Sequence, residues 1–546
     1  MSGGQPYSRS HTYYPFATGA RNPCLHGWQG LGPASPGAGV GGMTAGNAAS
    51  RMSTDQTLTN PESAIRTPQS GRAARGTVAL VLSQGCYFFF GYLAVVLLAR
   101  ALGPRDYALY GVVLSVLVWL EQVGKFAIPT AAARLLAQPD TAARAVERAT
   151  LFLNLILYSA IFGCLWLAAP LLASWLGIPN GTFFFRLAAL DLPLFGAYTA
   201  LQAIHQGHHR FVRLGGAGIT YAFTKFAGVW VIIQLGVSVE KALIVNALTT
   251  VAGITFLVTR FSDTKGPSWR SAVDTVLRIA GPMAVYSLFL MMIGNINLWL
   301  LQLLRPAETA ITGIYLAALN IARVPGFGLV AVAAVILPSV ARAAAAEDRE
   351  LVRRYIYQAL RFFLLLYLPV AFGLVFLAEE VMQLAYGAKY SGGGPLLSVL
   401  LVAEGLSTVL AILGSVLVAL GRVWRAALIA SLSILLSIPL IVVLALKFGA
   451  VGSAFAAVVT GLVSLTVMVW VIRREYGPLL QEQTGLNAVT AAGLLALSAL
   501  FITGGLLAKL AVVSTGVLVY GLALIFLGEI TSRDIAPFLK RSTATD

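Results

Sequence analysis

Residues 129–149 read PTAAARLLAQPDTAARAVERA, and about 210 residues later the chain reads PSVARAAAAEDRELVRRYIYQA, at 338–359. In both copies a proline closes an apolar run, a basic alanine-rich amphipathic segment follows, and another long apolar run begins. Recurrence at a near-constant offset indicates that a whole unit of the chain is duplicated. Duplicated bundles of apolar helices are typical of membrane transporters, whose binding site lies between the halves.

The composition indicates a protein that crosses a membrane many times. Hydrophobic residues make up 58% of the 546 residues, charged residues make up 11%, and the mean hydropathy is +0.80. A soluble domain is roughly half apolar and about a quarter charged. The net charge of +16 comes from basic residues between apolar runs, so anionic lipid head groups explain it better than nucleic acid does. The three cysteines lack metal-binding spacing, and we expect no metal site.

Fourteen apolar runs are long enough to cross a bilayer as helices, since about 20 residues span its hydrocarbon core. They predict an all-α polytopic membrane protein. The expected spans are 77–99, 107–127, 149–170, 182–204, 214–235, 238–259, 276–303, 312–339, 357–378, 395–419, 426–446, 450–471, 487–508 and 511–529. Nineteen basic residues lie in the even-numbered connections and the C-terminal tail, against seven in the odd-numbered connections. The positive-inside rule therefore predicts that both termini are cytoplasmic.

Two further echoes extend the duplication. LLARALGPRDYALYG at 97–111 compares with LLQLLRPAETAITGIYLA at 300–317, and QGHHRFVR after span 4 compares with LGRVWR after span 10. Because each half has six spans, the repeats are expected to be parallel and related by an axis along the membrane normal. The expected organisation is a disordered cytoplasmic tail (1–76), a first six-helix lobe (77–260), a cytoplasmic linker (261–275), a second six-helix lobe (276–472), two additional spans (473–530) and a cytoplasmic C-terminal tail (531–546).

Met52 offers an alternative start, and on that hypothesis residues 1–51 are not part of the native protein. The tail contains Gly, Ser, Pro, Thr and Arg but no apolar run, so it does not read as a cleavable signal peptide.

Four stretches resemble the polysaccharide transporter branch of the multidrug, oligosaccharidyl-lipid and polysaccharide (MOP) flippase superfamily. They are LLARALGPRDYALYG (97–111), TGIYLAALNIARVP (312–325), ILPSVARAAAAED (336–348) and LAEEVMQLAYGAKYSGGGPLLSVL (377–400). The resemblance implies a V-shaped bundle of two six-helix lobes that opens alternately to either side of the bacterial cytoplasmic membrane. It also implies a flippase for undecaprenyl-pyrophosphate-linked oligosaccharide in surface polysaccharide synthesis, with a glycan polymerase and glycosyltransferases as partners. Many members carry an Asp in span 7 where this chain has Asn295 and Asn297, so no coupling carboxylate carries over there.

Basic side chains at mid-depth are the expected binding groups for a lipid pyrophosphate, which exchanges its water for fixed cations when it enters the bilayer. Arg323 lies near the centre of span 8 beside Asn320, Lys225 lies in the middle of span 5, and Arg186 lies near the outer end of span 4. Structural roles are the alternatives. Arg323 would pair with an internal carboxylate, Lys225 would pair with Asp191, and Arg186 would reach lipid head groups.

Glu404 and Asp191 are the acids well inside expected spans. If transport is coupled to H⁺ or Na⁺, one of them is the expected carrier, and a structural partner for Arg or Lys is the alternative. Glu121 and Lys125 close span 2 four residues apart and are expected to neutralise each other. No other cofactor is expected.

Four amides in spans 1 and 7, Gln84, Asn295, Asn297 and Gln302, could bind sugar hydroxyls or stabilise helix packing. The HQGHH tract at 205–209 resembles a metal-binding tract, but a basic turn at the membrane surface is the favoured interpretation.

The sequence contains no nucleotide-binding loop and no nucleophile constellation, so we expect no catalytic residue and no direct use of ATP. The remaining alternatives are a multidrug or cation antiporter and a flippase for the peptidoglycan precursor lipid II. A membrane-embedded glycan-processing enzyme is the alternative from a different class. The short outer loops, of which 379–394 is the longest, disfavour it.

Overall fold

The computed structural model describes residues 68–137, 143–258, 269–479 and 505–527, together with the single positions 487, 490, 493 and 529. Every regular element in these ranges is a helix, and no strand occurs in them. Most of the N-terminal tail, most of the expected linker, most of span 13 and the C-terminal tail lie outside the described residues. The predicted all-α class is confirmed for the described part of the chain.

Two very long helices are each a pair of spans. Helix α1 (Pro68–Phe126) has 59 residues, which would extend on the order of 90 Å, about three times the hydrocarbon core of a bilayer. It is interrupted at Gly103, whose φ of 76° is available to glycine without strain, and Pro104 starts the next segment. Helix α14 (Val423–Tyr476) is interrupted in the same way at Gly449. Each helix therefore holds two consecutive spans.

The remaining helices follow the expected order. They are α2 (Ile128–Leu136), α3 (Ala143–Trp175), α4 (Gly181–Ala189), α5 (Asp191–Gly207), α6 (Phe211–Gln234), α7 (Val239–Leu257), α8 (Trp269–Ile293), α9 (Ile296–Leu304), α10 (Thr309–Ala345), α11 (Arg349–Phe376), α12 (Ala378–Tyr386), α13 (Gly394–Ala419) and α16 (Leu506–Phe526), with 3-10 turns η2 (Pro306–Glu308) and η3 (Ala388–Tyr390). We call α1–α7 the first half and α8–α14 the second half.

Length and hydropathy qualify nine helices of the described residues as candidate membrane spans, or ten if the bent pair α8–α9 is one span. Because two of the nine are the long interrupted helices, the described residues hold more spans than that number. The total of fourteen stays a prediction, since span 13 is not described.

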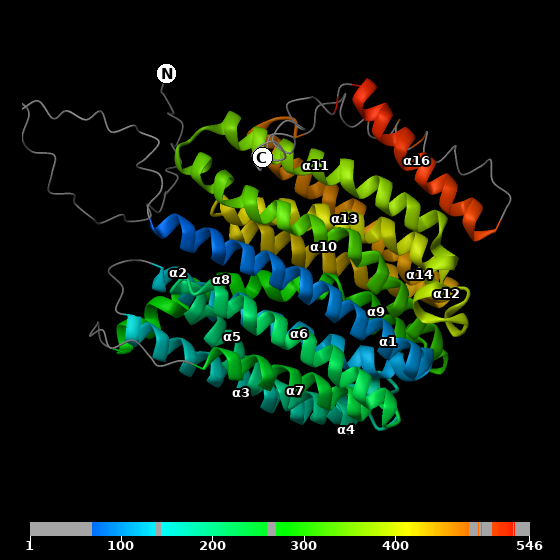
Figure 1. Cartoon of the computed structure of the whole chain (residues 1–546), viewed down its shortest axis with the longest axis horizontal. Coiled ribbons are helices and arrows are strands. Elements are labelled where there is room, and N and C mark those ends of the chain that lie inside the picture. Colours follow the sequence, from blue (N-terminus) through cyan, green and yellow to red (C-terminus); the bar gives the residue numbers. More distant parts are fainter. Residues whose placement is uncertain are drawn as a thin grey trace, which may run out of the picture. The chain divides into compact units, whose positions relative to one another are not determined.

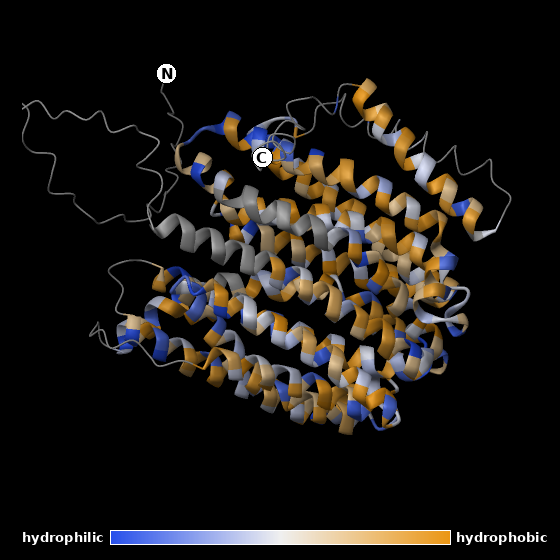
Figure 2. Ribbon diagram, in the orientation of Figure 1, coloured by the Kyte–Doolittle hydropathy of each residue, from blue (hydrophilic) through white to orange (hydrophobic). Residues whose placement is uncertain are grey.

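Helix α1 forms the edge of the first half that faces the second half, and it packs against α6 on one side and α10 on the other (Figure 1). Apolar residues run along the middle of the helices, and hydrophilic residues gather toward their ends (Figure 2). This distribution is what a bilayer requires, since charged groups are costly in its core.

Two spans contain a break near their middle. Helices α4 and α5 meet at Leu190, whose backbone stays helical, so they continue one span. Helices α8 and α9 meet at Gly294 and Asn295 with a bend of 52° between their axes. Such breaks free backbone carbonyls that must find partners inside the protein.

The duplicated proline segments differ in structure. In the first copy the chain breaks at Ala127, and Pro129 lies in the first turn of the short helix α2. In the second copy α10 continues past position 338 to Ala345, beyond the expected end of span 8. Helix α1 likewise begins at Pro68, before the expected start at residue 77. The apolar pattern marks the membrane-embedded part of a helix, whereas helical hydrogen bonding continues into polar sequence beyond it.

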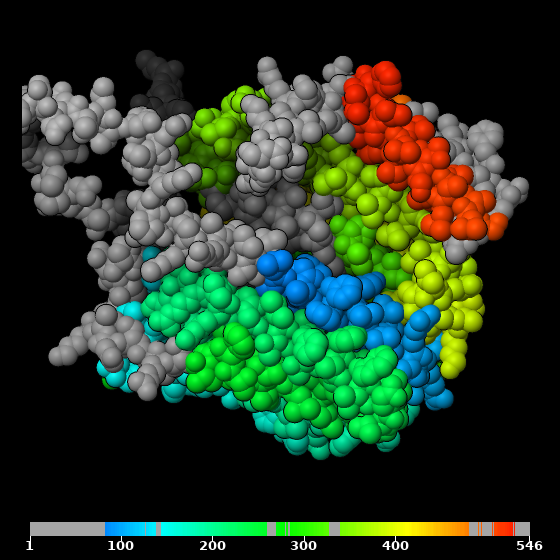
Figure 3. Space-filling model, in the orientation of Figure 1, coloured from blue at the N-terminus to red at the C-terminus, as the bar shows by residue number. Residues whose placement is uncertain are grey.

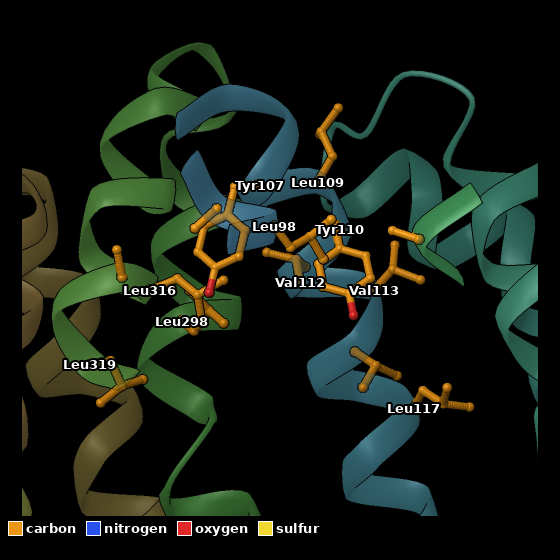
Figure 4. Packing of buried hydrophobic residues seen from close by; sticks show 14 of the residues in the cluster. Leu98, Tyr107, Leu109, Tyr110, Val112, Val113, Leu117, Leu298, Leu316 and Leu319 are labelled. Carbon is orange, nitrogen blue, oxygen red and sulfur yellow. The ribbon is translucent and has the colours of Figure 1, made fainter. Parts of the chain in front are cut away.

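The largest core cluster joins the halves where α1 crosses α9 and α10. Figure 4 shows Tyr107 of α1 directed toward Leu298 of α9 and Leu316 of α10. Two glycines permit this close approach. A Cβ at Gly111 would overlap Leu316, and a Cβ at Gly313 would overlap the Pro104 carbonyl.

Helix α16, drawn in red in Figure 3, lies at the edge of the view and packs against α11. The Tyr520 hydroxyl donates to the Leu365 carbonyl over 3.2 Å, and Lys509 at its start pairs with Glu380 of α12.

Candidate functional site

Arg323 lies inside the second half, on α10, and its guanidinium has two partners. Its Nε lies 3.4 Å from Glu404 Oε1 of α13, and one Nη donates to the Gly294 carbonyl oxygen over 2.5 Å. The two side chains are 25% and 18% exposed, so neither is sealed in the core. The carbonyl of Gly294 can accept this side-chain bond because the helix breaks between α8 and α9 and leaves it without a helical backbone partner. Arg323 therefore holds the break of span 7 and the acid of span 10 together.

The internal carboxylate partner that the sequence offered as the alternative for Arg323 is thus present, and it is Glu404, one of the two expected ion carriers. A guanidinium has five N–H donors, and these two contacts use two of them. An anion could therefore approach the remaining donors and then compete with Glu404 for the guanidinium. The substrate role of Arg323 and the ion-carrier role of Glu404 stay predictions.

A second polar network lies inside the first half. Lys225 Nζ of α6 donates to Asn246 Oδ1 of α7 over 3.1 Å, and Asn246 Nδ2 donates to Asp191 Oδ2 of α5 over 2.7 Å. The expected link between Lys225 and Asp191 therefore runs through a neutral amide. Asp191 and Asn246 are both buried, and the amide donates to the carboxylate and accepts from the ammonium group.

Glu121 belongs to the same network. Its side chain is buried, and the charges of Asp191, Lys225 and Lys125 all act on it. The Lys125 side chain is exposed at the end of α1. Glu121 on α1 therefore belongs to a cluster that also includes α5, α6 and α7, in addition to its expected pairing with Lys125.

The other candidates have separate environments. Asn320 Nδ2 donates to the Tyr107 hydroxyl over 2.8 Å and so joins α10 to α1. Asn295 Nδ2 donates to the Met291 carbonyl over 3.0 Å at the break of span 7. Asn297 accepts a hydrogen bond from Ser453 through its backbone oxygen, which places it beside α14.

The remaining two candidates do not join either network in the described contacts. The guanidinium of Arg186 lies over the Trp166 ring, 5.3 Å from its centroid, which is a cation–π contact within the first half. Gln84 is exposed on the first segment of α1. Neither observation decides between a substrate role and a structural one.

The histidines of the HQGHH tract contact protein groups. His208 Nε2 lies 2.5 Å from Glu147 Oε1, and His205 Nε2 lies 2.9 Å from the Leu257 carbonyl oxygen. No group of three or more His, Cys, Asp or Glu side chains with metal-binding geometry occurs among the described residues.

A seam of contacts between the halves lies at the helix ends that the charge distribution places outside. Arg100 donates to the Leu384 carbonyl over 2.9 Å, and the Tyr390 hydroxyl donates to the Ala99 carbonyl over 2.8 Å. Gln302 donates to the Leu176 carbonyl over 3.1 Å. These bonds, with the α1–α10 glycine contacts, hold the two halves together at this end.

Glu379 shapes the loop that carries Tyr390. Its carboxylate accepts hydrogen bonds from the backbone N–H groups of Gly392, over 2.9 Å, and Gly394, over 3.0 Å, and from Gln383 over 3.0 Å. Partial burial acts to raise the pKa of Glu379, but these hydrogen bonds outweigh it and hold the pKa below the usual value for glutamate.

Sequence reasoning missed Asn246 and Gly294. Asn246 is one amide in an otherwise apolar helix, and that signal was present in the sequence. The sequence GNINLW sets a glycine and two amides inside span 7, but it carries no signal that the Gly294 carbonyl contacts Arg323, because that contact comes from the bend.

Residues 97–393, more than half of the chain, match the family described as polysaccharide biosynthesis protein. The chain belongs to this family. A curated relative of this polysaccharide biosynthesis protein is the probable low-salt glycan biosynthesis flippase Agl15 of Haloferax volcanii, 30% identical over 126 residues. That alignment covers 23% of this chain and 27% of the relative, so the chain matches about a quarter of its length.

Solved structures show which fold the polysaccharide biosynthesis protein has. It is similar to the lipid II flippase MurJ in an inward closed conformation, with a TM-score of 0.61 and 16% identity, over 82% of this chain and 99% of that one. It is also similar to an inward-facing multidrug resistance MATE family transporter of the MOP superfamily, with a TM-score of 0.60 and 17% identity, over 71% and 95%.

A third similar structure is a MOP superfamily transporter from Pyrococcus furiosus, with a TM-score of 0.56 and 16% identity, over 75% of this chain and 96% of that one. These likenesses show that the chain has the MOP-type fold, as its sequence indicated. The proteins named here are described as flippases and transporters, and none of them as an enzyme.

Proposed function

We propose that this protein is a flippase that moves a polyprenyl-pyrophosphate-linked oligosaccharide across the cytoplasmic membrane by alternating access, for surface polysaccharide synthesis. Membership of the polysaccharide biosynthesis family and similarity to a probable glycan biosynthesis flippase support this proposal. The observation that carries it is Arg323, a cation at mid-depth with unused donors and a side chain 25% exposed.

The chemistry of the substrate calls for such a cation. A pyrophosphate needs charge-assisted hydrogen bonds when it leaves water, and a guanidinium supplies them in a planar fork. The carboxylate of Glu404 keeps Arg323 neutralised while no anion is bound. The bound pyrophosphate would take over that task, so binding would weaken the contact between α10 and α13.

The seam between the halves supports a direction of access. Contacts from Arg100, Tyr390 and Gln302 hold the halves together at the end that the charge distribution places outside. A substrate made in the cytoplasm would enter at the opposite end and leave when the seam separates. The proposal includes a cytoplasmic location of both termini, undecaprenyl as the polyprenyl chain, and a glycan polymerase and glycosyltransferases as functional partners.

Ion coupling forms part of the proposal. Asp191 lies in a buried network with Lys225 and Glu121, and Glu404 lies in an ion pair. Either acid could take up H⁺ or Na⁺ while its basic partner is released. Export driven in proteoliposomes by a proton gradient and then by a sodium gradient, with Asp191→Asn and Glu404→Gln compared, would assign the carrier.

One observation favours a second candidate, a cation antiporter. The polar network of the first half contains two buried acids, Glu121 and Asp191, with one lysine, Lys225, and a buried acidic cluster is what an organic cation would need. Under this alternative Glu121→Gln would abolish drug resistance in a sensitive host. Under the flippase proposal, Glu121→Gln reduces glycan export and leaves drug resistance unchanged.

The test of the proposed function is export of a surface glycan in cells that lack the chromosomal copy of this protein. Arg323→Ala is expected to abolish export while the protein still inserts into the membrane, and Arg323→Lys is expected to retain part of it. Arg342→Ala is the matched control, because this arginine is exposed on the same helix and its described side-chain bond is to Ser339. Full export by Arg323→Ala would refute the proposal.

A further inference from the structure

A cavity of about 510 Å³ opens between the halves, and none of its lining residues belongs to either polar network. Its walls come from α1, α3 and α9. The lining residues used below are Trp119, Cys164, Ala168, Trp175, Trp299 and Leu303. Trp175, Leu303 and Cys164 are exposed, so the cavity has an open mouth on the surface of the bundle.

The cavity offers almost no polar group to an occupant. The rings of Trp119 and Trp299 meet edge to face at 5.4 Å between centroids. Both indole N–H groups are already used inside the protein: Trp119 donates to the Leu288 carbonyl over 3.1 Å and Trp299 donates to Ser115 Oγ over 2.8 Å. The other lining side chains are apolar, apart from the thiol of Cys164 and the indole N–H of Trp175, which lies at the exposed mouth. A sugar or a phosphate would lose its hydrogen bonds here, so the occupant is a hydrocarbon.

Helix α9 connects this cavity to the Arg323 site. It provides Trp299 and Leu303 to the cavity wall, and it begins at Ile296, directly after the break whose Gly294 carbonyl binds Arg323. A cation suited to a pyrophosphate and a cavity suited to a hydrocarbon therefore lie beside the same short helix. This arrangement matches a molecule with an anionic head and an apolar tail.

The bilayer itself provides hydrocarbon, so burial alone does not select an occupant. Lipid tails are as apolar as the cavity wall, and moving a chain from one to the other gains little hydrophobic free energy. A chain attached to a head group bound at Arg323 is different, because the attachment raises its effective concentration at the cavity. The tethered tail is therefore favoured over free acyl chains.

We propose that the cavity between α1, α3 and α9 binds the part of the polyprenyl chain next to the pyrophosphate while that head group is held at Arg323. This inference rests on the proposed function, because it takes the lipid-linked substrate from it. The cavity extends along α9 and the last turns of α3, toward the end that the charge distribution places outside. It would therefore direct the tail toward the outer leaflet before the head is released.

Photo-crosslinking in proteoliposomes tests this site with the full chain. p-Benzoylphenylalanine is placed at Cys164 in one variant and at Leu167 in a control, which lies on the same helix, is 78% exposed and does not line the cavity. The probe is radiolabelled undecaprenyl pyrophosphate. Unlabelled undecaprenyl pyrophosphate, undecaprenol and dioleoyl phosphatidate are the competitors.

We expect crosslinking at position 164 to exceed that at 167 by about fivefold or more, because the tethered chain is concentrated at the cavity. Undecaprenyl pyrophosphate should compete, and undecaprenol and phosphatidate at the same concentration should not. Arg323→Ala should abolish the excess. Ala168→Trp should abolish it by filling the cavity, whereas Leu167→Trp, in the variant with the crosslinker at 164, should leave it unchanged.

Equal crosslinking at the two positions would overturn the proposal, and so would equal competition by undecaprenol or by phosphatidate, which would make the cavity a site for bilayer lipid. Failure of the flippase function has a different signature. In that case Arg323→Ala exports glycan fully, whatever the crosslinking shows. Unfolding of Ala168→Trp is checked by its melting temperature, and Arg323→Ala tests the tether independently.

Discussion

Asp191 and Glu404 occupy equivalent positions in the two halves, because each lies ten residues after the glycine that begins its span, Gly181 in α4 and Gly394 in α13. Their partners differ. Glu404 contacts Arg323 directly, whereas Asp191 reaches Lys225 through the amide of Asn246. An acid thus lies ten residues after the first glycine of the span in both halves, with a different basic partner in each.

Asn246→Ala should destabilise the protein by about 1–3 kcal/mol, because it leaves Asp191 and Lys225 without the amide that links them in a buried site. The measurement is the melting temperature in detergent. Thr255→Val on the same helix is the control, since this residue is exposed and its described bond is local. Equal melting temperatures for the two variants would show that the network contributes nothing to stability.

Glu404→Gln should strengthen binding of undecaprenyl pyrophosphate about tenfold, or about 1.4 kcal/mol, because Arg323 then has no carboxylate to exchange for the ligand. Titration of the purified protein in detergent gives the Kd. Glu350→Gln is the control, since Glu350 pairs with Arg353 on the exposed start of α11. A Kd unchanged by Glu404→Gln would mean that the ion pair does not compete with the ligand.

Gly313→Ala should prevent close approach of α10 to α1, because its Cβ would overlap the Pro104 carbonyl oxygen. We expect Cys introduced at Asn320 to react with an externally added charged maleimide several-fold faster in this variant. Gly91→Ala is the control on α1, where an added Cβ meets nothing within 4 Å. Unchanged labelling would show that the seam does not depend on this contact.

Acid should loosen the loop that carries Tyr390. The folded pKa of Glu379 lies below its ordinary value, so its stabilising effect is complete above the unfolded pKa of about 4.3 and is lost as the pH falls below that value through the folded pKa. The melting-temperature difference between wild type and Glu379→Gln should therefore be constant from neutral pH to about pH 5 and shrink below about pH 4.3. A difference that grows on acidification would contradict this assignment.

The sequence located the helices and breaks that depend only on residues close together along the chain. Apolar runs gave the spans, and their edges lie close to the breaks at Gly103 and Gly449, where glycine adopts a positive φ. The bend of span 7 was not expected, although GNINLW places a glycine and two amides there. Some helices extend beyond the limits expected from hydropathy, because helical hydrogen bonds continue past the apolar run. This happens at the start of α1, at Pro68, and at the end of α10, at Ala345.

From the sequence, individual candidate site residues were also easier to identify than the residues they contact. Arg323, Lys225, Asp191 and Glu404 stand out because an ionisable residue inside a span is costly and therefore rare. Their geometry depends on contacts between distant residues. Glu404 is 81 positions from Arg323, and Asn246 is 55 positions from Asp191.

The sequence by itself determined an all-helical membrane protein, the charged residues within its apolar spans and its family, because hydropathy and charge act through the bilayer on each segment separately. Only the tertiary structure decided that Arg323 holds both the Glu404 carboxylate and the Gly294 carbonyl, that Asn246 links Asp191 to Lys225, and that an apolar cavity adjoins α9. These features depend on how helices from different parts of the chain pack. Packing brings together groups whose spacing along the chain carries no signal of their contact.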